Sequence, residues 1–293
     1  MWPPRKIIFP VDFSDRSSSA ARYVRTLACR FHSEICLIHV LPVPVFWTAS
    51  LESRALVLED AWDEQKGRAR RDLVDFAAGE LAPLRVEPMV LEGEPAGVIV
   101  GQAREQNADV IVMATHGYSQ FRRFILGSVT AKVLHDADCP VWTGVHLAEG
   151  QGEALEPKAL IKQVACAVDL SANSQKVLES AAHLADSFGA RLFVIHAIQG
   201  LATSDEDYYQ RDWRESLAGR AREQVEQLQQ RAGTAAQELI VAGEVPRAVC
   251  SQAAELGADV LVIGRSAESG LFGRLRTNAY AIIRGAHCAV LSV

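Results

Sequence analysis

The feature of this sequence that most suggests chemistry is the spacing of two glycines and a serine. Gly117 and Gly127 flank nine residues, and Ser128 directly precedes a segment with the apolar periodicity of a helix. A glycine there lets backbone N–H groups approach an anion closely, and the start of a helix adds unpaired N–H groups and a favourable dipole. The spacing therefore predicts a phosphate-binding loop within residues 114–130. The alternative is that Ser128 only caps the helix, because serine is a common N-cap residue.

Several motifs that mark catalysis are missing from the sequence. There is no Gly-x-x-x-x-Gly-Lys-Ser/Thr loop, no Gly-x-Ser-x-Gly elbow, no His-Glu-x-x-His pair and no Gly-x-Gly-x-x-Gly after the first predicted strand. Phosphoryl transfer needs charge stabilisation from groups of this kind. We therefore expect a binding protein with no catalytic residue, in which any hydrolysis of a bound phosphate compound is slow and incidental.

The histidines and cysteines are expected to be structural. His39 and His196 occupy equivalent places near the end of a predicted strand, and no carboxylate or cysteine is spaced to join them as a metal ligand, so no metal site is predicted. The cysteines are scattered without a Cys-x-x-Cys pair, which favours free buried thiols in a reducing compartment. They are Cys29, Cys36, Cys139, Cys166, Cys250 and Cys288; Cys139 and Cys288 repeat just before a last strand and are expected to be buried as small apolar groups.

The sequence repeats itself. Residues 7–40 match residues 164–197 at an offset of 157, so that Asp12 matches Asp169, and residues 106–114 match 256–264 at an offset of 150. One unit of about 145 residues has therefore been duplicated, and each copy is long enough to bury its own core. We predict a first domain at 1–146, a linker rich in Gly, Glu and Pro at 147–160, and a second domain at 161–293.

Apolar periodicity predicts alternating strands and helices in each copy. Ile7–Val11 is a continuous apolar run, which is typical of a strand buried on both faces. Asp12 and Ser14 or Asp15 then supply N-cap chemistry for a helix that runs to about Phe31. The other predicted elements of the first copy are strands at Ile35–Leu41, Val86–Leu91, Asp109–Ala114 and Val141–Val145, and helices within Ala55–Glu80, at Pro95–Gln106 and from Ser128 to about His135.

This alternation implies right-handed βαβ units and a doubly wound parallel sheet in each domain. Ligands of such sheets bind beyond the carboxyl ends of the strands. Asp12 and the loop after the fourth strand are therefore expected at the same edge. The last strands, Val141–Val145 and Ala289–Val293, should lie at a sheet edge, where an uncovered apolar strand is prone to association.

The composition limits the partners. The chain of 293 residues is 49% hydrophobic and 23% charged, with a formal net charge of -6. Neither half is basic, so we expect no nucleic-acid partner, because coating DNA requires many phosphate contacts from Lys and Arg. The apolar runs are too short to span a bilayer and the N-terminus lacks the pattern of a signal peptide, so we expect no membrane partner and a cytoplasmic location.

Six segments, found in order, carry a resemblance to a known family. They are PVDFS, LIHV, EGEPA, NADVIVMATHG, LGSVTAKVL and CPV. With these segments the chain resembles the universal stress protein family over nearly its whole length, as a tandem of two such domains. The resemblance implies two five-stranded parallel sheets of a Rossmann- or flavodoxin-like α/β fold. It also implies that the domains pair through their last strands as an intrachain pseudo-dimer, or associate further into a homodimer.

Many members of this family bind ATP through Gly-x-x-Gly, nine residues and then Gly-Ser/Thr. Alanine replaces the first glycine here, which places a methyl group of Ala114 near the phosphates. Asp12 and Val40 match positions that hold adenosine, and Val129 matches a neighbour of the phosphate loop. The nucleotide-binding residues that the resemblance implies are Pro10, Val11, Asp12, Val40, Met113, Ala114, His116, Gly117, Gly127, Ser128 and Val129.

The second copy departs further from the family pattern. Gly264 is kept, but Ala267 replaces the second glycine and Thr277–Asn278 replaces the final pair. Its loop carries Arg265, Arg274 and Arg276, which are able to grip an anion, although exposed loop arginines are usually only solvated. We therefore expect a weaker or repurposed second site, formed by Asp169, Gly264, Arg265 and Asn278.

The resemblance implies a stress-response regulatory protein that binds an adenine nucleotide, ATP, mainly in the first domain. Mg²⁺ is inferred only as the ion that ATP normally carries. Bound nucleotide would order residues 115–128 and alter a surface that partners read. Two alternatives stay open. One is an interaction protein of the stress response without a nucleotide, and the other is a binder of another small molecule, such as an acyl chain or metal ion, through the loops at 42–54 and 200–212.

Overall fold

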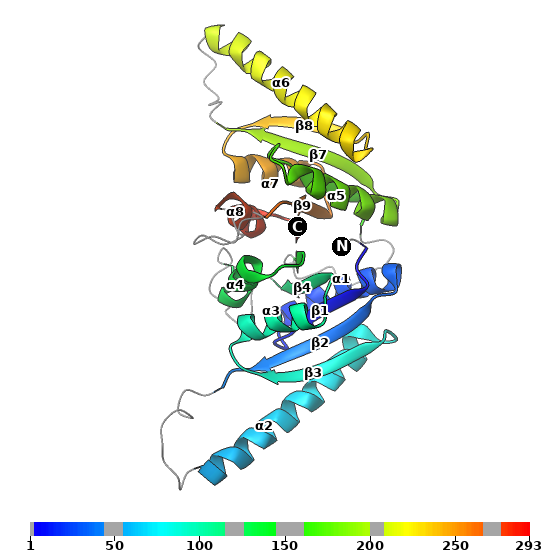
Figure 1. Ribbon diagram of the computed structural model, residues 1–293, viewed down its shortest axis with the longest axis vertical. Coiled ribbons are helices and arrows are strands. Elements are labelled where there is room, and N and C mark those ends of the chain that lie inside the picture. Colours follow the sequence, from blue (N-terminus) through cyan, green and yellow to red (C-terminus); the bar gives the residue numbers. More distant parts are fainter. Residues whose placement is uncertain (1–2, 44–54, 115–125, 145–160, 200–207, 266–276) are drawn as a thin grey trace. The chain divides into compact units, whose positions relative to one another are not determined.

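The protein forms two compact units, Pro3–Cys139 and Pro140–Val293. The computed structural model describes residues 3–43, 55–114, 126–144, 161–199, 208–265 and 277–293 (Figure 1). Each unit has parallel strands with helices on both faces, which confirms the predicted doubly wound α/β class. The predicted linker at 147–160 lies outside the described residues.

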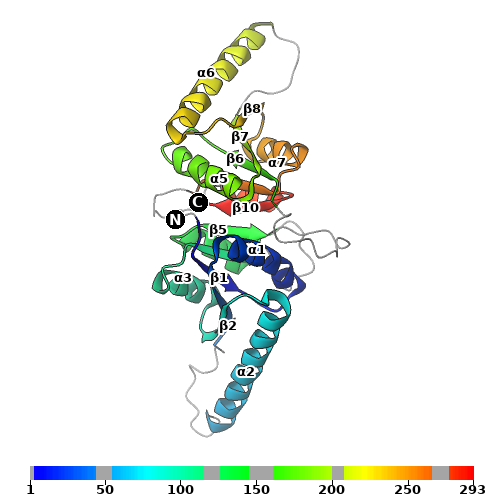
Figure 2. The ribbon, with the colours of Figure 1, turned by 90° about the vertical axis from the view of Figure 1, so that its right-hand side faces the viewer.

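The first unit contains a parallel sheet in the spatial order β3-β2-β1-β4. Helices α1 and α2 cover one face of this sheet and α3 covers the other (Figures 1 and 2). The strands are β1 (Lys6–Pro10), β2 (Glu34–Leu41), β3 (Val86–Glu92) and β4 (Val110–Ala114), and the helices are α1 (Asp15–Phe31), α2 (Ala55–Phe76), α3 (Pro95–Glu105) and α4 (Ser128–Asp136). A π-helical turn, η2 (Ala77–Leu81), follows α2, where the sequence predicted one continuous helix to Glu80.

The second repeat has the same order as β8-β7-β6-β9-β10, and these five strands are parallel. Figure 2 shows α5 and α6 on one face and α7 on the other. The strands are β6 (Gln163–Ala167), β7 (Arg191–Ile198), β8 (Gln237–Ala242), β9 (Val260–Ile263) and β10 (Ala289–Ser292), and the helices are α5 (Ser174–Phe188), α6 (Tyr208–Ala232), α7 (Val245–Glu255) and α8 (Thr277–Gly285).

Strand β5 (Val141–Gly144) belongs to the first repeat in sequence but groups with the second unit in space. It pairs antiparallel with β10, Trp142 opposite Leu291 and both buried. The hydroxyl of Thr143 donates to the carbonyl of Val290 at 3.3 Å, and that of Ser292 to the carbonyl of Val141 at 3.1 Å. The predicted pairing of the two last strands is thus confirmed, and it covers an apolar edge that would otherwise favour association.

Helix α1 begins and ends where the sequence predicts. Ser14 is its N-cap, and the Ser14 hydroxyl accepts from the backbone N–H of Ser17 at 3.4 Å. The helix ends at Phe31 because His32 adopts the left-handed conformation, with φ of 54°. Between these ends a buried stripe packs against the sheet, and it consists of Ala20, Val24, Leu27 and Ala28.

An aspartate found in both repeats links the start of the first strand to the start of the fourth strand by hydrogen bonds. Oδ2 of Asp109 accepts from the backbone N–H groups of Arg5 at 2.8 Å and Lys6 at 3.0 Å. In the second repeat, Asp259 accepts in the same way from Lys162 at 2.7 Å and from the next residue at 2.9 Å. Burial opposes the charged form of Asp109, yet its pKa lies below the usual 3.8, and these backbone donors are among the groups that lower it.

We predict that Asp109→Asn lowers the free energy of unfolding by about 1–2 kcal/mol at pH 7, because an amide is a weaker acceptor than a carboxylate. Since the folded-state pKa of Asp109 is lowered, its contribution is complete above the unfolded value of 3.8 and is lost as the pH falls through the folded value. Urea unfolding from pH 7 to pH 3 measures this difference. Asp75→Asn, on the exposed part of α2, is the matched control, and an equal loss in both variants would contradict the assignment.

Candidate functional site

The carboxyl ends of β1 and β4 meet at one edge of the first sheet. The two strands pair in parallel, Ile7 with Val110 and Ile8 with Ile111. Asp12 lies two residues beyond the end of β1, and the residue between them, Val11, donates its N–H to Ile38 of β2 at 2.8 Å. The predicted positions Pro10 and Ala114 end β1 and β4, Val40 lies near the end of β2, and Met113 is buried within β4.

Asp12 organises the turn that leads from β1 into α1. Its Oδ1 accepts from the N–H of Ser14 at 3.1 Å, from the Ser14 hydroxyl at 2.6 Å and from the Ser17 hydroxyl at 2.7 Å. Within the described residues no such bond reaches Oδ2 of Asp12. The second repeat is built alike, since Oδ1 of Asp169 accepts from the Ser171 N–H and the Ser174 hydroxyl, both at 3.0 Å. The aspartate therefore fixes the backbone at the edge of the sheet.

The two histidines at this edge also hold the turn. Nδ1 of His39 lies 2.9 Å from the carbonyl oxygen of Val11, and Nδ1 of His196 lies 2.9 Å from that of Val168. A carbonyl oxygen only accepts, so in each contact Nδ1 carries the proton and Nε2 is left as an acceptor. This agrees with the structural role favoured from the sequence.

The start of α4 is the part of the site nearest to an anion-binding geometry. Gly127 is the N-cap residue, with φ of -58° and ψ of 144°, and it supplies no side-chain cap. The alternative in which Ser128 caps the helix is therefore wrong, because Ser128 is its exposed first residue, followed by the half-buried Val129. The Thr130 hydroxyl donates to the carbonyl of Ala114 at 3.0 Å and joins the first turn of α4 to the end of β4. His116 and Gly117 lie outside the described residues.

In the second unit, the four residues predicted for the weaker site line one cavity of about 420 Å³. Asp169 follows β6, Gly264 and Arg265 follow β9, and Asn278 lies in the first turn of α8. This volume lies within the range of small-molecule sites. The sequence did not predict that this cavity also includes His196 and an apolar wall from α7 and α8.

The two repeats distribute side-chain volume differently at the end of the fourth strand. A Cβ atom built on Gly264 would lie 3.0 Å from Cγ2 of Val177 and 3.1 Å from the Asn173 amide nitrogen. The first repeat has Ala114 at the position of Gly264 and the smaller Ala20 at the position of Val177. The methyl group of Ala114 is therefore matched by a smaller partner on the facing helix.

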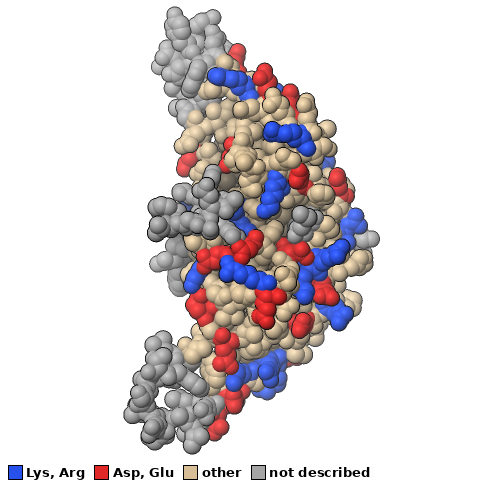
Figure 3. Space-filling view, viewed as in Figure 1, with Lys and Arg blue, Asp and Glu red and all other residues tan. Residues whose placement is uncertain are grey.

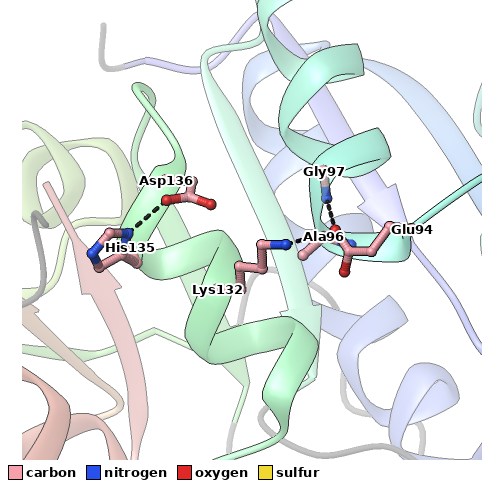
Figure 4. A network of polar contacts seen from close by, with 6 residues as sticks. All are labelled: Glu94, Ala96, Gly97, Lys132, His135 and Asp136. Carbon is pink, nitrogen blue, oxygen red and sulfur yellow. Dashed lines mark hydrogen bonds and ion pairs between the residues drawn. The ribbon is translucent and has the colours of Figure 1, made fainter.

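An ion pair next to the first site was missed from the sequence. Glu94, the N-cap of α3, accepts from the N–H groups of Ala96 at 3.2 Å and Gly97 at 2.8 Å, and Lys132 of α4 reaches it at 2.9 Å (Figure 4). The hydrogen bond from Lys132, with those from Gly97 and Ala96, lowers the pKa of Glu94. Pro95 marks the start of α3 in the sequence, but the contact between Glu94 and Lys132 joins residues 38 positions apart.

The thiols follow the sequence prediction only in part. Cys36, Cys166, Cys250 and Cys288 are buried, whereas Cys29 is exposed and Cys139 is half-buried, so the prediction of uniformly buried thiols is wrong. Cys29 lies at the solvent-facing end of α1. Burial raises the pKa of Cys250 to about 11 and that of Cys288 to about 12, so both are protonated at neutral pH and are poor nucleophiles.

Metal ligands and membrane spans were sought in the part of the chain that the structure describes. There, no three His, Cys, Asp or Glu side chains gather as a metal site, and no helix has the length and apolarity to cross a bilayer. On the face shown in Figure 3, acidic and basic side chains are interspersed over the described residues.

Together, the strand order and the edge marked by Asp12, Ala114 and Gly127 define a doubly wound α/β protein with a ligand-type site at the carboxyl ends of its strands. The model of the Universal stress protein family matches residues 3–143 and again residues 161–293. The chain therefore belongs to the universal stress protein family and carries two copies of its domain in tandem.

Individual relatives match one repeat of the chain. Universal stress protein MJ0531 of Methanocaldococcus jannaschii is 34% identical over 137 residues, 47% of this chain and 79% of its own length. Universal stress protein YxiE of Bacillus subtilis is 30% identical over 141 residues, 46% of this chain and 95% of its own length. A universal stress protein from Archaeoglobus fulgidus has a similar fold over 99% of this chain and 98% of its own, with a TM-score of 0.67 and 19% identity.

We predict that Gly264→Ala lowers the free energy of unfolding by about 1–3 kcal/mol, because the new methyl group would lie only 3.0 Å from Cγ2 of Val177. Adding Val177→Ala recreates the pair found in the first repeat. The double variant should therefore lose less than the sum of the two single losses, with a coupling of at least about 0.5 kcal/mol.

Chemical denaturation of the two single variants and the double variant measures this coupling. Gly101→Ala is the matched control, since a Cβ built on Gly101 meets nothing within 4 Å. Strictly additive losses would show that the two positions do not compensate for one another.

Proposed function

We propose that the protein is a stress-response regulator that binds an adenine nucleotide, ATP, in its first repeat. The observation that carries this proposal is the start of α4, where Gly127 caps the helix without a side chain, beyond the end of β4. The N–H groups of that first turn and the helix dipole form a seat for phosphate. Family membership supports the proposal through the positions that match the nucleotide pattern.

The other residues of this edge have roles that suit a nucleotide. Oδ2 of Asp12 is placed to accept from a ribose hydroxyl, because the turn holds the carboxylate through Oδ1. Arg16, the second residue of α1, has a buried Nη1 that makes no hydrogen bond within the described part of the chain. Arg16 in the first repeat is equivalent to Asn173 in the second repeat, and Asn173 lines the cavity of the second unit. A guanidinium there adds positive charge for a polyphosphate.

The proposal includes no dedicated catalysis. Binding would act by ordering residues 115–128 and thereby changing a surface that other proteins recognise. Mg²⁺ enters only as the ion that accompanies ATP. The same proposal includes a cytoplasmic location and the association of two chains into a homodimer. It also includes the lack of nucleic-acid and membrane partners, which is supported by the net charge of -6 and the interspersed charges.

We predict that Gly127→Asp weakens ATP binding about tenfold or more while keeping the fold. The φ and ψ angles of Gly127 suit aspartate, and aspartate is a good N-cap residue, so α4 should be stabilised. The new carboxylate takes the N–H groups that would bind phosphate, and it repels the phosphate charge. Calorimetric titration with ATP and with adenosine measures the effect, and adenosine binding should change much less.

Gly101→Asp is the control for an added negative charge, since Gly101 faces open space on α3. Equal ATP affinity in wild type and Gly127→Asp would refute the seat at α4. Lack of ATP binding by the wild type would instead favour the interaction protein without a nucleotide.

A further inference from the structure

The cavity of the second unit contains a buried arginine. Arg265 follows β9 directly, is only 6% exposed and lines the cavity. Its backbone is held on both sides, since its N–H donates to the carbonyl of Val293 at 2.8 Å and its carbonyl accepts from the Asn173 amide at 3.0 Å. The base of this side chain is therefore fixed, and the residue as a whole is shielded from bulk water.

The charge of this cavity suits a single negative group better than a polyphosphate. Among its described lining residues, Asp169 and Arg265 are the side chains with a full charge at neutral pH, and they are of opposite sign. The second repeat has Asn173 at the position of Arg16. This change removes a positive charge that is proposed to help hold a polyphosphate in the first repeat.

The opposite wall of the cavity is apolar. It is formed by Val245 and Val249 of α7 and by Ile282 of α8. Ile282 of α8 takes the position of Val133 of α4, which is also buried and apolar, so both repeats keep an apolar residue here. A ligand that buries hydrocarbon or a ring against this wall gains free energy by leaving water.

Polar groups complete the cavity. His196 lines it with Nδ1 fixed on the carbonyl of Val168, so its Nε2 is left as an acceptor. Asn278 lines it from the first turn of α8. A few fixed polar groups beside a mainly apolar wall are typical of sites for small organic molecules.

We propose that this cavity binds a small organic anion with one acidic group, held by Arg265, on an apolar or aromatic body that packs against α7 and α8. The acidic group is a carboxylate or a single phosphate. The proposal does not rest on nucleotide binding by the first repeat, because none of these residues belongs to that repeat.

The experiment uses the full chain carrying Gly127→Asp, in which the proposed seat of the first repeat is blocked. Titration with 3-phenylpropionate, with AMP and with ATP distinguishes the two sources of the acidic group from a polyphosphate. We expect phenylpropionate or AMP to bind more tightly than ATP. Adding Arg265→Gln should weaken that binding about tenfold or more, because a charge-assisted hydrogen bond is lost.

Arg284→Gln, on the exposed last turn of α8, is the matched control and should leave the affinity unchanged. Arg265→Gln removes a buried group and is therefore expected to destabilise the second unit, so Asn278→Asp is the second variant. It adds a negative charge beside the cavity at the first turn of a helix, where aspartate is tolerated. It should weaken binding of the anion while leaving the melting temperature within a few degrees of its parent.

Three outcomes would overturn the proposal. They are the absence of binding by both phenylpropionate and AMP, binding that neither Arg265→Gln nor Asn278→Asp weakens, and tighter binding of ATP than of either probe. The last outcome would make the cavity a second polyphosphate site. None of them depends on the affinity of the unmodified first repeat for ATP, which the Gly127→Asp and Gly101→Asp comparison tests separately.

Discussion

The architecture of both units depends on one carboxylate that closes the turn after the first strand. At Asp12 and Asp169 the side chain accepts hydrogen bonds from the residues two and five positions further on. These bonds hold the intervening residue, Phe13 or Leu170, at a φ of 61°, a left-handed conformation that such residues rarely adopt. The turn begins the first helix and keeps the aspartate at the carboxyl edge of the sheet. Fold and candidate site therefore depend on the same contact.

Near this turn, which both repeats share, the two repeats differ in the size and charge of their side chains. The first repeat combines Ala114 with Ala20, whereas the second combines Gly264 with the larger Val177, which lies close to it. The charged residues of the two repeats also differ. The second repeat lacks the arginine at the start of its first helix and has Arg265 after its fourth strand. Both changes alter the lining of the edge without altering the sheet, which is how one scaffold supports ligands of different chemistry.

Much of the fold was predictable because the duplication repeats the signal. Apolar runs predicted the strands, and N-cap serine with a periodic stripe predicted α1 from the turn to Phe31. The Ala-Asp-Val segment was visible as a repeat, but its hydrogen bonds from Asp109 to the start of β1 were not, since they join residues more than 100 positions apart. The same limit applies to Lys132 and Glu94, and to the cavity beside Arg265. Periodicity reports which face of an element is buried, whereas these contacts depend on how loops bring two elements together.

A chain with two tandem domains can carry two different sites, whereas the two sites of a symmetric dimer are identical. In a homodimer of single domains, every substitution appears in both sites, so a change that suits a new ligand also removes the old one. In this chain the buried Arg265 occurs in the second repeat alone, and Gly127 keeps a helix start without a side-chain cap in the first. The antiparallel pairing of β5 with β10 joins the last strands of the two repeats in one chain. Under the two proposals each chain would carry one site of each kind. Two ligands of different charge would then bind one molecule in fixed proportion, and this would follow from the covalent connection, without any change in the fold of either repeat.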